Sequence, residues 1–239
     1  MPLRLATRNL LAELILDALD SPRAATAVRC LAAYARTGKR SPPVVSPGQL
    51  LAPAPAAERE QVRRYLEDHS LLSWRRRGPV RQVTLASELG PDWSQVAAKL
   101  QRYGHALAVW QPRPELSELD LAVRKGVLLF NQRLFFEVHE VLEAQWIQEV
   151  DPERRFLQGL IQIAVAFYHL GNHNLGGALS LLDDGLDKIR PHAPTYLGLE
   201  LSDFIVGLER CGEEMRWLGP QGLERFQDAD IPSLQHSES

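Results

Sequence analysis

The sequence predicts a mainly α-helical protein, in which a small N-terminal module of three helices and a β-hairpin precedes an all-α helical bundle. Two observations support this prediction. Apolar residues recur at helical spacing along most of the chain, and they alternate with polar residues only within residues 71–86. Charge is unevenly divided, with a net charge of +7 over residues 1–105 and −10 over residues 106–239. Two modules of opposite charge either have different partners or attract each other.

The composition is that of an ordinary globular protein, with 239 residues of which 45% are hydrophobic and 24% charged. Cys30 and Cys211 are far apart and lack metal-ligand spacing, which argues against a disulfide scaffold or a cysteine-based zinc site and fits a reducing compartment. Charged residues interrupt the leucines of residues 1–19, so we expect no signal peptide. The apolar run at residues 160–170 is too short to span a bilayer. We therefore expect a cytoplasmic protein with no membrane partner.

The N-terminal module, residues 1–90, begins with helical patterns. Leucines or other apolar residues at helical spacing predict three helices, over residues 7–19, 22–36 and 56–69. Ser21 is a good N-cap and Pro22 suits the first position of the second helix. Residues 37–55 are rich in Pro, Gly and Ser, which predicts a loop.

A β-hairpin is predicted directly after the third helix. Residues 71–75 and 80–85 alternate in polarity, and a segment containing Gly78 and Pro79 separates them. Three helices followed by a hairpin is the order of a winged helix-turn-helix domain, and the resemblance, in architecture only, covers about residues 7–87. In such a domain the third helix enters the major groove and the hairpin is the wing.

Arginines are concentrated on the two parts of this module that would face DNA. The candidate nucleic-acid-binding residues are Arg59, Arg63 and Arg64 on the helix and Arg75, Arg76, Arg77 and Arg81 on the hairpin. Arginines on a hairpin can neutralise DNA phosphates, which provides affinity without reading sequence. Duplex DNA is therefore an expected partner. The alternative is a module for protein contacts, whose arginines are solvated or contact the acidic half of the chain.

The second module is predicted to be a compact helical bundle. Residues 91–115 form a linking helix and a proline-containing linker, residues 116–222 form the bundle, and residues 223–239 form a flexible tail. Helical patterns predict five helices, near residues 117–130, 133–148, 153–170, 173–189 and 199–217. The short connections between them favour antiparallel neighbours.

Two of these helices carry polar residues within apolar patterns. In the helix predicted near residues 133–148, successive residues are about 100° apart, so the apolar residues form one arc around the helix axis. His139 lies within this arc and Glu143 lies one turn further along. The apolar members of the arc are Phe135, Phe136, Val138, Leu142 and Trp146. On the next helix, Gln158, Gln162 and His169 share one stripe with Val165. A buried polar group without a partner costs roughly 1–3 kcal/mol. We therefore expect the two helices to share a buried polar cluster.

The same two helices resemble a known family. The run from Leu129 to Trp146, with Phe-Glu-Val-His-Glu-Val-Leu-Glu at its centre, and the run from Phe156 to Ala178 resemble domain-of-unknown-function family 309 over about residues 116–190. The resemblance implies an all-α bundle. It supplies no activity, because the family is functionally uncharacterised, although some members are labelled metal-dependent hydrolases.

The spacing of the polar residues suggests a divalent metal site. His139 and Glu143, four residues apart on one helical face, can reach one ion, and His169 would add a nitrogen from the facing helix. Histidine and carboxylate ligands suit zinc, manganese or iron. Glu140 is the candidate catalytic base for metal-assisted hydrolysis. Glu143 stands where a zinc-protease helix has its second histidine, so that motif is absent.

Three interpretations stay open. The candidate ligand-binding residues are Gln158, Gln162 and Asn174. In the leading interpretation the protein is DNA-associated or regulatory, and the polar cluster binds a metal or small ligand. The second is a metal-dependent hydrolase. The third is a non-catalytic structural or interaction module, in which His139 hydrogen-bonds to Glu143 or Gln162 to set helix register and Asn174 is a helix cap.

Overall fold

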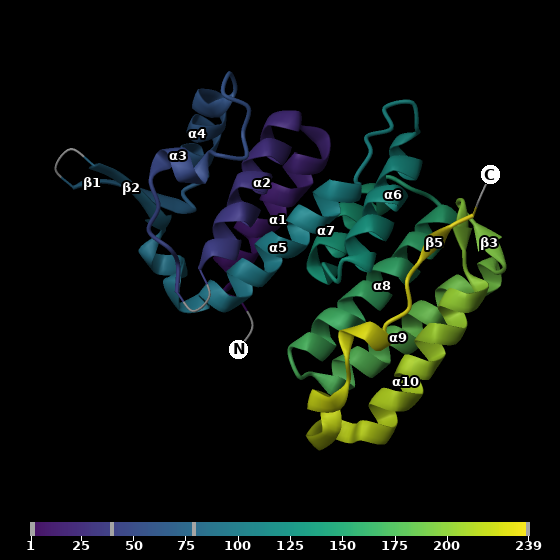
Figure 1. Ribbon diagram of the computed structural model, residues 1–239. Coiled ribbons are helices and arrows are strands. Elements are labelled where there is room, and N and C mark those ends of the chain that lie inside the picture. The colour runs from purple at the N-terminus through teal and green to yellow at the C-terminus, as the bar shows by residue number, and fades with distance from the viewer. Residues whose placement is uncertain (1–2, 39–40, 78–79, 238–239) are drawn as a thin grey trace. The chain divides into compact units, whose positions relative to one another are not determined.

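A computed structural model of the protein describes residues 3–38, 41–77 and 80–237 (Figure 1). The chain forms two compact units, the first ending at Pro112 and the second beginning at Arg113. The described residues contain ten α-helices and two small sheets, so the protein is mainly α-helical as predicted. No helix of the described segments combines the length and the apolar character that crossing a membrane requires.

In the N-terminal unit, the described residues form five α-helices and a hairpin. Its elements are α1 (Leu5–Asp20), α2 (Pro22–Thr37), α3 (Pro47–Leu50), α4 (Arg59–Asp68), β1 (Leu72–Arg77), β2 (Val80–Leu85) and α5 (Trp93–Val109). As the sequence indicates, Ser21 caps α2, because its Oγ accepts from the backbone N–H of Ala24 at 3.3 Å. The predicted linking helix is instead part of this unit: α5 contacts α2 and buries Trp93, Leu100 and Tyr103.

The loop predicted over residues 37–55 contains two short elements. Ser46 and Gln49 form a capping box on α3. Just before it, Val45 and Val83 form an antiparallel bridge, with backbone N–H to carbonyl distances of 2.9 and 2.8 Å. One bridge and one four-residue helix are too short to produce a periodic pattern. The resulting order is a helix, a bridging residue, two helices and a hairpin.

The hairpin is anchored at its base and carries arginines toward its tip. Leu72 lies opposite Leu85, Trp74 opposite Val83 and, further out, Arg76 opposite Arg81. The hydroxyl of Tyr34 on α2 accepts from the backbone N–H of Leu85 at 2.9 Å and donates to the carbonyl of Pro43 at 2.8 Å. Because the base of the hairpin is buried and its outer part is exposed, the arginines lie in solvent beyond the core.

The C-terminal unit is helical, as predicted, and also carries a small antiparallel sheet. Its helices are α6 (Glu118–Asn131), α7 (Phe135–Trp146), α8 (Glu153–Gly171), α9 (Leu175–Ile189) and α10 (Ser202–Gly222). The sheet has the order β3 (Thr195–Tyr196), β4 (Leu199–Glu200) and β5 (Gln235–His236).

The segment after residue 222 is structured as far as residue 237, which corrects the prediction of a flexible tail. Ile231 and Leu234 are each only 3% exposed. The Asn131 side chain donates to the carbonyl of Leu234 at 2.8 Å and accepts from its N–H at 2.9 Å. Arg133 donates to the carbonyl of Ile231. Two apolar residues in a polar segment produce no periodic pattern, so this long-range packing was not visible in the sequence.

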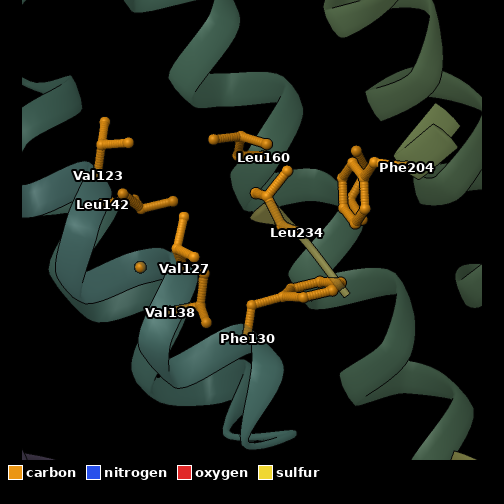
Figure 2. Close-up of a pocket in the computed structure, with 10 residues that line it drawn as sticks. Val123, Val127, Phe130, Val138, Leu142, Leu160, Phe204 and Leu234 are labelled. Atoms are coloured by element: carbon orange, nitrogen blue, oxygen red, sulfur yellow. The ribbon is translucent and has the colours of Figure 1, made fainter. Parts of the chain in front are cut away.

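Four phenylalanines join the helices of the bundle. The ring of Phe130 on α6 lies 5.3 Å from Phe135, 6.0 Å from Phe167 and 5.4 Å from Phe204, measured between centroids. Phe130 and Phe204 lie beside a cavity of about 10 Å³ that is lined by apolar residues (Figure 2). The gap is barely large enough for one water and its surface is almost wholly apolar, so we assign it to imperfect packing and not to a ligand.

Glycines allow α8 and α9 to approach closely. A methyl group at Gly185 would lie 2.8 Å from the carbonyl oxygen of Gly159. A methyl group at Gly159 would lie 3.1 Å from the carbonyl oxygen of Gly185 and 2.7 Å from the Ile189 side chain. Both glycines therefore serve helix packing.

Gly185→Ala is expected to destabilise the protein by up to about 2 kcal/mol. Overpacking against backbone costs roughly 1–3 kcal/mol, and the better helix propensity of alanine offsets only about 1 kcal/mol. The matched control is Gly176→Ala on the same helix, where no atom lies within 4 Å of the added methyl group and a small gain is expected. Urea unfolding of both variants checks this; a shift of the same sign in both would contradict it.

Candidate functional site

A histidine and two glutamates cluster on α7. His139 Nδ1 lies 3.0 Å from Glu140 Oε1, and His139 Nε2 lies 3.6 Å from Glu143 Oε2. One ligand atom from each residue lies within 4.8 Å of the other two. Among the described residues this is the one such group of three His, Cys, Asp or Glu side chains. His139 and Glu143 therefore lie close together, as their spacing in the sequence predicts. Glu140 lies close to both of them.

The cluster is half-exposed, which corrects the prediction of a buried one. The side chains of His139, Glu140 and Glu143 are 27%, 38% and 47% exposed. The predicted arc relied on Phe136 and Trp146, which are both only half-buried. The buried residues of α7 are Phe135, Glu137, Val138, Leu142 and Gln145. The helix is thus rotated relative to the prediction, and His139 lies at the edge of the buried face.

The polar residues that are buried in this unit are not among those predicted from the sequence pattern. Glu137 on α7 is fully buried, and Lys125 on α6 is 8% exposed. Gln145 is 9% exposed, and its amide donates to the Glu149 carboxylate. At about 100° per residue, Glu137 points away from the predicted apolar arc, so no pattern marked it as buried.

Of the remaining predicted ligands, His169 does not belong to the α7 cluster. His169 Nδ1 is 2.9 Å from the side-chain amide of Asn174, and Asn174 caps α9 by accepting from the N–H of Gly177 at 3.1 Å. Gln162 has a buried Oε1 without a hydrogen-bond partner in the described part of the chain. Gln158 lines an open groove with Arg154 and other residues. The structure therefore does not bring His169 to His139 as a shared metal ligand.

On α4, the arginines predicted to enter the major groove have partners within the protein. Arg63 lies 2.7 Å from Glu60 and also contacts Glu67, and Arg64 lies 3.1 Å from Glu60. Arg59 donates to a backbone carbonyl in the preceding turn. The hydrogen bond from Arg63 lowers the pKa of the Glu60 carboxyl to about 2. Internal carboxylates thus compete with phosphates for Arg63 and Arg64.

The hairpin presents its arginines beside a groove. Arg75, Arg76 and Arg81 are exposed. The groove, about 230 Å³ in volume, is lined by Pro47, Arg63, Glu67, Trp74, Arg75, Arg76, Arg81 and Gln82. The side chain of Arg77, also predicted to contact nucleic acid, lies outside the described residues. The basic surface is therefore centred on the hairpin.

Neither cysteine adds a reactive site. Cys30 and Cys211 are both buried. Burial raises the pKa of the Cys30 thiol to about 11 and that of the Cys211 thiol to about 12. Both side chains are therefore neutral thiols at physiological pH.

Residues 123–181, from α6 to α9, match the family described as a domain of unknown function, DUF309. The uncharacterized protein YpuF of Bacillus subtilis (strain 168) is 40% identical over 86 residues, which are 35% of this chain and 49% of that protein. The chain thus spans about half the length of this curated relative. The matched region includes the α7 cluster and confirms the resemblance, but neither description names an activity.

Proposed function

We propose that the protein binds duplex DNA through the arginines of its N-terminal hairpin. The observation that supports the proposal is the order of α2, the Val45–Val83 bridge, α3, α4 and the hairpin. This order resembles the architecture of a winged-helix domain, in which the arginine-bearing hairpin would be the wing. The unit also lies in the half of the chain that carries a net charge of +7. Such a role implies a cytoplasmic location.

The arrangement of the hairpin favours an anionic partner. Arg76 and Arg81 are directly opposite each other, and like charges in this relation destabilise a hairpin. A phosphate group beside them would be attracted by both guanidinium groups. Arg75 lies opposite Gln82, which can add an amide donor. These are contacts to the DNA backbone, which provide affinity and orientation but no sequence readout.

The predicted recognition helix supports binding of low sequence specificity. From Arg59 to Asp68, α4 carries three arginines and three acidic residues, and its net charge is zero. Because Glu60 holds both Arg63 and Arg64, base contacts from these arginines would require breaking ion pairs. We therefore assign the main binding energy to the hairpin.

The proposal is tested by fluorescence anisotropy of the full chain with two labelled duplexes of unrelated sequence. Both are expected to bind with similar affinity. Three phosphate contacts predict a loss of roughly 40-fold between about 50 and 200 mM salt. No binding at the lower salt concentration would contradict the proposal.

A second candidate function is divalent-metal binding by the α7 cluster. His139, Glu140 and Glu143 offer one imidazole and two carboxylates at ligand spacing, a set that suits zinc, manganese or iron. A bound ion would supply Lewis-acid chemistry. Since Glu140 lies among the ligand atoms, a metal-dependent hydrolase would need another group as its general base. The cluster is therefore proposed as a metal-binding site of a regulatory module, with hydrolysis as the alternative.

The metal proposal predicts different results for two histidine variants. His139→Ala removes the central ligand, so protein purified without chelator is expected to lose most of its metal. His169→Ala is expected to retain it, because His169 contacts Asn174 and lies outside the cluster. Plasma mass spectrometry of the full-length proteins measures the content. Equal metal content in wild type and both variants would exclude the site.

A further inference from the structure

We propose that the C-terminal unit binds a small phosphate-bearing molecule in a groove between the start of α8 and the end of α9. The groove has a volume of about 460 Å³ and is lined by Asp151, Arg154, Arg155, Gln158 and Lys188. This volume lies within the range of about 300–1,000 Å³ that is typical of small-molecule sites. The lining contains three cationic side chains and one amide but only one carboxylate, so its net positive charge favours an anionic ligand. The site is independent of the DNA and metal proposals.

Among the described residues, the cations of the groove have no carboxylate partner, unlike other basic residues of the same unit. Arg190 and Arg216 each form ion pairs with neighbouring acidic residues at 2.7 Å. No ion pair joins Arg154, Arg155 or Lys188 to a carboxylate of the described chain. Yet residues 106–239 carry a net charge of −10, so acidic partners are plentiful. Three neighbouring cations left in this state repel one another, and a bound anion would neutralise them.

Contacts within the protein position two of these cations beside the groove. A methyl group at Gly159 would lie 3.0 Å from Lys188 Cβ, so the close approach of α8 and α9 brings Lys188 beside the first turns of α8. Arg154 Cζ lies 4.4 Å over the Trp146 ring, a cation–π contact, and Arg154 Nη1 donates to the carbonyl of Glu149 at 3.5 Å. Because these contacts exist before a ligand arrives, binding loses less side-chain entropy.

The side chains match the chemistry of a phosphate group. The planar guanidinium groups of Arg154 and Arg155 can donate two parallel hydrogen bonds to phosphate oxygens. Lys188 adds a compact charge and Gln158 an amide donor. The α4–hairpin groove of the N-terminal unit is smaller, about 230 Å³. The larger polar groove therefore suits a whole phosphorylated small molecule.

A small ligand fits this unit better than a nucleic acid does. A net charge of −10 repels an extended polyanion, whose phosphates would pass beyond the groove. A compact anion lies entirely within about one Debye length of the three cations. Asp151 is the one carboxylate of the lining and opposes any anion. Its removal should therefore tighten binding.

Inorganic pyrophosphate titrated into the full chain by isothermal calorimetry tests the site. The variants R155Q and K188Q are expected to weaken binding about tenfold or more each, because each loses a charge-assisted contact. D151N is expected to bind a few-fold more tightly. The matched control is R210Q, which removes the same charge from an exposed position on α10 that does not line the groove.

Three results would overturn this proposal. The first is no pyrophosphate binding by wild type at low salt. The second is a loss in R210Q as large as in R155Q, which would mean attraction by net charge alone. The third is a parallel loss of duplex DNA affinity in R155Q and K188Q, which would make the groove part of a nucleic-acid surface. The two proposals can be tested separately. R76Q/R81Q should weaken duplex DNA binding and leave the affinity for pyrophosphate unchanged.

Discussion

The double variant R76Q/R81Q is expected to bind duplex DNA about a hundredfold more weakly than wild type near 0.1 M salt. Each phosphate contact releases counterions that contribute roughly tenfold to affinity at this salt concentration, and the variant loses two contacts. The two arginines lie opposite each other on the exposed part of the hairpin, so they reach one stretch of backbone together. Fluorescence anisotropy of the full chain with a labelled duplex measures the change.

The matched control for this prediction is R23Q/R36Q. Both arginines are exposed on α2 of the same unit, and their replacement removes the same charge from residues that belong neither to the hairpin nor to the lining of its groove. Its affinity should stay within a few-fold of wild type. Both double variants should also unfold within about 0.5 kcal/mol of wild type, as exposed substitutions usually do. Equal losses of affinity in the two would mean that net charge, and not the hairpin, attracts DNA.

Phe130→Ala is expected to destabilise the C-terminal unit by about 3–5 kcal/mol. Phe130 is 3% exposed, and its ring contacts the rings of Phe135, Phe167 and Phe204 from three other helices. Each aromatic pair contributes about 0.5–1.5 kcal/mol beyond its buried area. The variant also enlarges the apolar gap beside Phe204 (Figure 2). Denaturant unfolding measures the loss, and hydrogen exchange locates it.

An exposed aromatic residue of the same unit provides the control. Trp217 on α10 is 79% exposed, so Trp217→Ala should change stability by no more than about 0.5 kcal/mol. Faster hydrogen exchange in Phe130→Ala should be concentrated in α6, α7, α8 and α10. A loss of similar size in both variants, or exchange confined to the N-terminal unit, would contradict the role assigned to this core.

Most helices of the protein could be predicted because their signals are local. The spacing of apolar residues predicted the ends of α8 and α9 to within two residues of the observed ends. Ser21 followed by Pro22 correctly predicted the start of α2. Long-range contacts left no such signal. The Val45–Val83 bridge joins residues 38 positions apart, and Leu234 packs against Asn131 across 103 positions. Such contacts depend on the fold as a whole.

The candidate sites were predictable only in part. Spacing on one helix was enough to bring His139 and Glu143 together, because helical geometry is local. Burial was not predictable, since neighbouring helices determine which face of α7 is covered. The groove that contains Arg155 and Lys188 depends on the approach of α8 and α9 at Gly159, a tertiary contact. The residue types therefore indicated which kinds of ligand each site could bind. They did not indicate which residues from different helices come together to form it.

The salt dependence of duplex binding tests the central claim most directly. The slope of log K against log salt concentration is measured for the full chain and for R76Q/R81Q. Each lost phosphate contact should reduce the magnitude of the slope by about 0.9, so the double variant should differ from wild type by about 1.8. Identical slopes, or wild-type binding that does not depend on salt, would show that the hairpin arginines do not contact the DNA backbone.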